Sequence, residues 1–189
     1  MRGVLPLVAL LVLGGTGPAA AASLTLDERG TGEAVRAGRE SVTRDAFDAE
    51  WRVANGAGGT VSVLTPFHRV ALAARHAAFK QETLKPSEVR KLQREQQGRL
   101  VLWVALRGRS DDFARFYAPL LLVDGREITP SFVQNERTAM RSEGGDFLAR
   151  CVYGFPIKDL KGTSRLQLVV RSGDGKDVSR FAIDLATMR

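Results

Sequence analysis

The feature that most constrains the fold is an apolar pattern of period two, which begins near residue 99 and recurs to the end of the chain. Alternation of apolar and polar residues over four to eight positions is typical of strands with one buried face. One run, Leu100–Leu106, is apolar almost throughout, so we expect a central strand buried on both faces. The pattern predicts five strands in this part of the chain: 100–106, 117–123, 147–155, 166–170 and 181–185.

Turn signals connect these runs into antiparallel pairs. Ser172-Gly173-Asp174-Gly175 predicts a hairpin between the last two strands, and Asp124-Gly125 predicts a turn after residue 123. Two shorter strands are expected upstream, at 47–53 and 60–64. Residues 131–146 are polar and are expected to form a long connection without strands.

Two helices are expected between the early strands and residue 99. Thr65-Pro66 is a capping residue followed by proline at the first helical position, and an Ala-rich amphipathic pattern continues to Lys80. A second helix is expected to open at Lys85-Pro86 and to end near Gly98. Both helices carry basic residues on one side.

These elements predict a mainly β fold with a helical insertion. We expect an antiparallel β-sandwich, immunoglobulin-like in outline, with a helix pair between early strands. The likeness to small exported sandwich domains is architectural and rests on the closing strands, residues 151–185. The predicted organisation is a signal peptide at 1–22, a flexible lead-in at 23–44, and one domain at 45–189 with the helical excursion at 65–98.

The first 22 residues predict export. Met1-Arg2 gives a positive start, Val4–Leu13 is a short apolar segment, and Ala20-Ala21-Ala22 supplies small residues at the cleavage position. A chain with this leader is expected to be periplasmic or extracellular after cleavage near Ala22. A retained N-terminal anchor is the alternative.

The residues that usually carry catalysis or bind metals are scarce. Cys151 is the single cysteine, and its alternation with Ala149 and Tyr153 places it on the expected core face. His68 and His76 are eight residues apart, whereas a helical metal pair needs a spacing of four. The sequence therefore predicts no metal site and no cofactor.

Charge provides the remaining functional signal. The formal net charge is +7, and residues 65–98 carry seven Lys or Arg against three Glu. We expect a basic binding patch there that meets an envelope protein or an anionic surface component, with peripheral membrane contact as one form of it. Nucleic acid is not expected, because export separates the chain from it and exposed aromatics do not interleave with the basic residues. The residues assigned to this patch are Arg69, Lys80, Arg90, Lys91 and Arg94.

A bias toward arginine is the competing explanation of this charge, since the chain has 22 Arg and 6 Lys. We favour an exported, non-enzymatic envelope protein that acts as a binding module through its basic helical face. One alternative is an exported hydrolase with a site near His68 or Cys151. Another is a small-ligand carrier with an apolar cavity near Phe67, Leu72 and Phe79.

Overall fold

A computed structural model describes residues 21–189 of the chain. The predicted signal peptide therefore lies outside the described residues, except for its last two positions. Ala22 is buried, and its N–H lies 3.1 Å from the carbonyl oxygen of Gly162 and 3.0 Å from that of Leu185. The segment from residue 22 onward is thus part of the packed domain.

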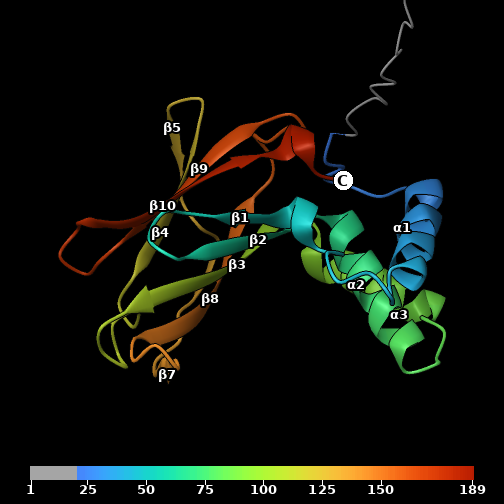
Figure 1. The fold of residues 1–189 in the computed structure, drawn as a ribbon. Helices are drawn as coiled ribbons and strands as arrows, with labels where there is room; N and C mark the ends of the chain where they lie inside the picture. Colours follow the sequence, from blue (N-terminus) through green and yellow to red (C-terminus); the bar gives the residue numbers. More distant parts are fainter. Residues whose placement is uncertain (1–20) are drawn as a thin grey trace, which may run out of the picture.

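Two antiparallel sheets form a β-sandwich that is immunoglobulin-like in outline, as predicted (Figure 1). The first, sheet A, has the order β1-β2-β3-β8-β6, with β7 also paired to β8; the second, sheet B, has the order β10-β9-β4-β5. Sheet A consists of β1 (Arg52–Ala54), β2 (Thr60–Leu64), β3 (Arg99–Gly108), β8 (Phe147–Pro156), β6 (Phe132–Gln134) and β7 (Met140–Arg141). Sheet B consists of β4 (Ala118–Val123), β5 (Arg126–Ile128), β9 (Arg165–Arg171) and β10 (Asp177–Asp184).

The main core lies between the two sheets. Alternate residues of the long strands point inward, which removes their apolar side chains from water and supplies the main stabilisation of the fold. Cys151 is on this inward face of β8, and burial raises the pKa of its thiol, which confirms its predicted place in the core. The largest fully buried side chains of the sandwich strands include Leu100, Leu102, Leu121, Tyr153, Phe155, Leu168, Phe181 and Ile183.

Three helices pack together at one end of the sandwich (Figure 1). They are α1 (Glu28–Glu40), α2 (Pro66–Phe79) and α3 (Pro86–Gln96), and two short 3-10 helices occupy Ala49–Trp51 and Leu185–Thr187. The helix pair α2–α3 lies between β2 and β3 in the chain, as predicted. Thr65 caps α2 through its hydroxyl, which accepts a hydrogen bond of 3.1 Å from the His68 N–H.

The prediction of a flexible lead-in at 23–44 is wrong, because α1 occupies most of it. Asp27 caps this helix, and its carboxylate accepts a hydrogen bond of 2.7 Å from the Gly30 N–H. Ala34 and Gly38 are buried against α2, and a Cβ at Gly38 would overlap the Ala71 carbonyl oxygen. The glycines of this segment suggested a loose chain, yet Gly38 serves to bring two helices close together.

Three further sequence predictions need correction. β3 is buried on one face only: Leu100 and Leu102 face the core, whereas Trp103 points to solvent on the outer face of sheet A. The expected polar connection at 131–146 contributes the short edge strands β6 and β7. The expected strand at 47–53 is mostly turn and 3-10 helix, and only its end forms β1.

Within residues 21–189, none of the helices combines the length and the apolar character that crossing a membrane requires.

Candidate functional site

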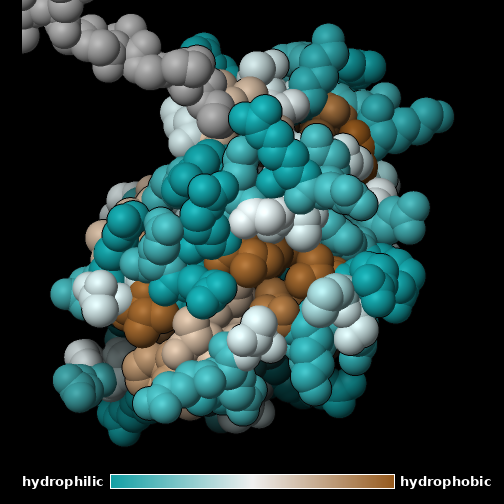
Figure 2. All heavy atoms as spheres, turned by 90° about the vertical axis from the view of Figure 1, so that its right-hand side faces the viewer, coloured by the Kyte–Doolittle hydropathy of each residue, from teal (hydrophilic) through white to brown (hydrophobic). Residues whose placement is uncertain are grey.

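A groove between α1 and α3 is the candidate site. Two adjoining hollows of about 350 and 580 Å³ share Leu26, Arg90 and Gln93, so they form one groove. Figure 2 shows this helical end of the molecule, where hydrophobic residues lie in a hollow bordered by hydrophilic ones. The apolar residues that line the groove are Leu24, Leu26, Val35, Pro66, Leu84, Pro86 and Val89.

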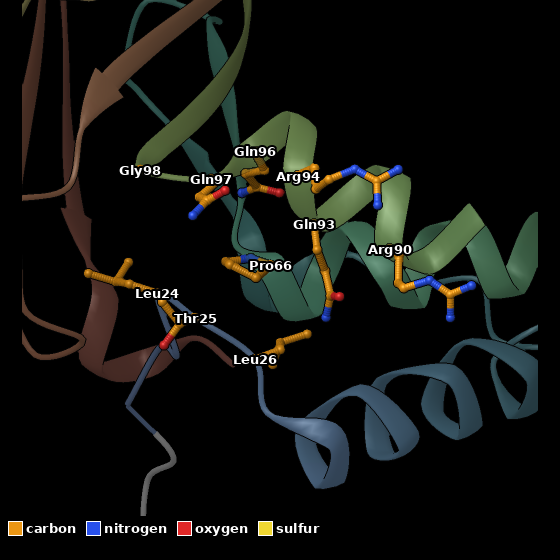
Figure 3. A pocket seen from close by; sticks show the side chains of 10 residues that line it. All are labelled: Leu24, Thr25, Leu26, Pro66, Arg90, Gln93, Arg94, Gln96, Gln97 and Gly98. Atoms are coloured by element: carbon orange, nitrogen blue, oxygen red, sulfur yellow. The ribbon is translucent and has the colours of Figure 1, made fainter. Parts of the chain in front are cut away.

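One hydrogen bond joins the two walls of the groove, and another anchors the α3 wall to the sheet. The Gln93 side chain of α3 donates to the Thr31 hydroxyl of α1 at 3.0 Å. The buried Gln96 side chain donates to the carbonyl oxygen of Leu64, which anchors the end of α3 to β2. In the close view, Gln93 points from α3 toward α1, with Leu26 on the opposite side (Figure 3). The groove is therefore a built feature of the helical end.

Arg90 and Arg94 supply the positive charge of the α3 wall. They lie one helical turn apart, and both side chains extend from α3 beside the groove (Figure 3). In the part of the chain that the structure describes, neither guanidinium has a carboxylate partner. Like charges at this spacing repel each other, so an anion placed between them would be favoured.

The other basic residues of the predicted patch are arranged differently. Arg69 is 2.7 Å from a carboxylate oxygen of Glu95, and Lys91 is 4.0 Å from the other oxygen of the same carboxylate. Lys80 is exposed at the C-terminal end of α2 and does not line the groove. Of the five residues of the predicted patch, only Arg90 and Arg94 line the groove.

The α1 wall of the groove has the opposite sign. Asp27 and Glu28, at the start of α1, line the larger hollow. The α3 side of the groove therefore favours negative groups of a ligand, whereas the α1 side repels them. A ligand that fits must be apolar along its middle and carry its negative groups on the side that faces α3.

His68 is buried in an aromatic cluster rather than in the groove. Its ring stacks on Trp51 with centroids 4.3 Å apart, and Nδ1 is 3.0 Å from the Val63 carbonyl oxygen, to which it donates. Nε2 is buried and finds no hydrogen-bond partner among residues 21–189. Burial lowers the pKa of this imidazole, more strongly than the Val63 carbonyl raises it. The ring is therefore neutral near pH 7.

We expect His68 to make the protein less stable in mild acid. The unfolded chain keeps the ordinary histidine pKa of about 6.5, whereas the pKa in the folded protein is lower. As the pH falls below the unfolded value, only the unfolded chain takes up a proton at this residue, so the free energy of unfolding falls. The loss between pH 7.5 and 5.5 is at most about 1.4 kcal/mol.

Urea unfolding at several pH values measures this effect in the wild type and in His68→Gln, with His76→Gln as the control. Gln keeps a donor for Val63 but does not titrate, so the stability of His68→Gln should depend less on pH. His76 is exposed, and its variant should behave like the wild type. An unchanged pH dependence in His68→Gln would refute this role of His68.

The structure does not bring the residues of the hydrolase alternative together. His68 contacts Trp51 and Val63 at the helical end, and no hydrogen bond among residues 21–189 joins its imidazole to a carboxylate or a hydroxyl side chain. Cys151 is 1% exposed in the sandwich core. A buried thiol with a raised pKa is mostly protonated at neutral pH, which makes it a poor nucleophile.

The cavity of the small-ligand alternative is not formed at the expected residues. Phe67 is buried beside Trp51, with ring centroids 6.3 Å apart, while Phe79 is 77% exposed at the end of α2. The two rings therefore do not enclose a common space. For metals, the described chain holds no cluster of three or more His, Cys, Asp or Glu side chains suited to one ion.

Sequence reasoning missed the α1 side of the groove entirely. Leu24 and Leu26 were assigned to a flexible segment, so their role as groove lining was not considered. A signal was present, because Asp27 precedes a stretch in which Ala34, Val35 and Gly38 recur at helical spacing.

Comparisons with known proteins assign the chain to no family. No protein-family model matches the sequence, and no curated protein matches it. A solved protein of unknown function from Burkholderia pseudomallei is 10% identical, with a TM-score of 0.43, over 86% of this chain and 92% of that one. An IgNAR antibody domain C1 is 14% identical, with a TM-score of 0.32, over 48% of this chain and 79% of that one.

Proposed function

We propose that the protein is an exported, non-enzymatic binding module of the cell envelope. Its ligand site is the α1–α3 groove, and its partner is an acidic segment of another envelope protein. This proposal narrows the predicted basic patch to the two arginines that border the groove.

The observation that carries the proposal is the pair Arg90 and Arg94. Eight of the 21 arginines in residues 21–189 lie beside a carboxylate, as Arg69 does beside Glu95 and Arg107 beside Asp146. Arg90 and Arg94 instead lie next to each other at the edge of an apolar groove. Carboxylates bound between two guanidiniums make charge-assisted hydrogen bonds and relieve the repulsion between them.

The form of the site favours a polypeptide over a lipid surface. A flat anionic membrane would bring negative charge toward Asp27 and Glu28 as well as toward the arginines, and the two effects would oppose each other. A peptide can place its carboxylates on the α3 side and its apolar side chains over Leu26 and Val89. The apolar lining would then contribute affinity and the arginines would fix the orientation.

Charge reversal at the groove tests the proposal. We expect Arg90→Glu/Arg94→Glu to reduce retention of the purified protein on isolated envelope membranes at least tenfold, while its circular dichroism stays unchanged. The matched control is Arg109→Glu/Arg126→Glu, which changes the net charge equally at exposed positions of the sandwich. The control should stay within twofold of the wild type.

Two further binding measurements identify the chemical class of the partner. Treating the membranes with protease beforehand should abolish retention, because the partner is a protein. Binding of equal strength to vesicles of pure anionic phospholipid would overturn the assignment to a protein partner. Equal losses in the groove variant and the control variant would show that only overall charge matters, and would refute the groove.

A further inference from the structure

A second surface, on the outer face of sheet A, carries an exposed tryptophan. Trp103 lies in the middle of β3 and pairs with Val152 of β8 on one side and Ser62 of β2 on the other. Its side chain is 48% exposed, although β3 is a central strand of the sheet. Val101 and Val152 are half-buried beside it, so the apolar surface is larger than one ring.

Arginines surround this tryptophan on the same face. Because residues at i and i+2 of a strand share a face, Arg99 and Arg107 lie at the two ends of the β3 row that contains Trp103. Residues that pair across antiparallel strands share a face. Arg150 of β8 pairs with Ala105, which is in the Trp103 row of β3, so Arg150 points outward. Arg52 of β1 pairs with Ser62 of β2, which itself pairs with Trp103, so Arg52 points outward as well. We refer to Trp103 with these four arginines as the Trp103 face.

Two of the four arginines have no acidic partner among residues 21–189. Arg107 lies 2.7 Å from Asp146, and Arg52 pairs with Asp48. Arg99 donates to the Glu95 carbonyl oxygen at 3.1 Å, and for Arg150 no side-chain partner is found. The face therefore combines an aromatic centre with net positive charge around it.

We propose that the Trp103 face docks a polypeptide segment in which a large apolar side chain is flanked by carboxylates. Trp and Arg, with Tyr, are the residue types enriched among the residues that carry most of the binding energy at protein interfaces. The ring covers the partner's apolar side chain, and the arginines pair with its carboxylates at the rim. This site is separate from the α1–α3 groove and does not depend on the function proposed for it.

Charge disfavours a second copy of this chain as the natural occupant. A symmetric dimer through this face would bring the same patch against itself, and with it Arg99 and Arg150 of each copy, which have no acidic partner among residues 21–189. Single-stranded nucleic acid is also disfavoured. Successive bases need stacking platforms in series, whereas the next exposed aromatic, Phe132, is on β6, with β8 between it and β3.

Selection from a random dodecapeptide display library tests the proposal. The purified full-length protein is the bait, and Trp103→Ser is used for counter-selection. We expect the enriched peptides to share an aromatic or large aliphatic residue with at least two Asp or Glu close to it. Enrichment of peptides without acids, or failure to enrich any peptide that depends on Trp103, would overturn the proposal.

Affinity of the best synthetic peptide is then measured by fluorescence anisotropy against matched variants. Trp103→Ser and Arg99→Glu/Arg150→Glu should each weaken binding at least tenfold. Phe116→Ala removes another exposed aromatic ring, 72% exposed, and should change binding less than twofold. Peptides that lose affinity with Arg90→Glu/Arg94→Glu but not with Trp103→Ser would bind the groove, and would count against the Trp103 face.

Two additional measurements exclude the other occupants. A labelled oligo-dT dodecamer should bind at least tenfold more weakly than the selected peptide, and equal binding would overturn the assignment in favour of nucleic acid. Light scattering after gel filtration should give the same mass for the wild type and Trp103→Ser. A wild-type dimer that becomes a monomer in Trp103→Ser would overturn the assignment to a peptide partner in favour of self-association.

Discussion

Replacing Gly38 by alanine should destabilise the protein by about 3 kcal/mol, the upper end of the usual cost of overpacking. The added methyl group would lie against the carbonyl oxygen of Ala71 and the side chain of Ala74. A backbone carbonyl inside a helix cannot rotate away as a flexible side chain can. The two helices must therefore separate, and the contacts of Ala34 with α2 would weaken with them.

Gly32 provides the matched control in the same helix. A Cβ at this position would have no atom within 4 Å, so Gly32→Ala meets no obstacle. Alanine also has the higher helix propensity, which should raise the free energy of unfolding by about 0.5–1 kcal/mol. Urea unfolding followed by circular dichroism measures both variants. Equal effects of the two substitutions would show that α1 is not closely packed on α2.

Trp51→Ala should lower the free energy of unfolding by about 4 kcal/mol, as large-to-small changes of buried aromatic residues do. Trp51 is fully buried where the sandwich meets the helices. It stacks on His68, and its indole N–H donates to the Arg189 carbonyl oxygen at 2.8 Å. Its removal leaves a cavity and a carbonyl oxygen with one partner fewer.

The other tryptophan is the natural control for this substitution. Trp103 is half exposed, so Trp103→Ala should cost less than about 1 kcal/mol. Both variants are measured by urea unfolding with circular dichroism detection, because each removes one of the chain's two tryptophan fluorophores. A Trp103→Ala variant as unstable as Trp51→Ala would mean that Trp103 is buried, and would remove the basis of the Trp103 face.

Much of the fold could be predicted from local patterns. The turn at Asp124–Gly125 is an example, since both residues have positive φ, as a tight hairpin of the right twist requires. The helix starts at Thr65-Pro66 and Lys85-Pro86 were equally readable. The helix α1 was missed because Gly38 has a tertiary purpose: the value of a glycine at this position depends on Ala71, which lies in another helix.

The one-sided burial of β3 could not be read from its composition. Val101, Trp103 and Ala105 are apolar like their inward neighbours, so the strand looked buried on both faces. The sequence does not reveal that, within residues 21–189, the outer face of sheet A lacks a second layer over β3. Apolar residues without a cover are informative once the structure is known, and here they point to a docking surface.

The candidate site was predicted in part. Arg90 and Arg94 were assigned to the basic patch from their helical spacing. Lys91 and Glu95 are four residues apart on α3, a spacing that the sequence does show. What the sequence could not show is that the Glu95 carboxylate also lies 2.7 Å from Arg69 of α2. Ion pairs between helices depend on how the helices pack, and local periodicity does not contain that information.

Site-specific photocrosslinking in the source organism tests the proposed groove most directly. A benzoylphenylalanine residue replaces Gln97, which is exposed and lines the groove, or Arg126 on sheet B as the control. We expect position 97 to give one discrete adduct with an acidic envelope protein. This adduct should disappear when Arg90→Glu/Arg94→Glu is added. Position 126 should give no such adduct. An adduct that survives the double charge reversal, or that forms equally from both positions, would contradict a binding site between α1 and α3.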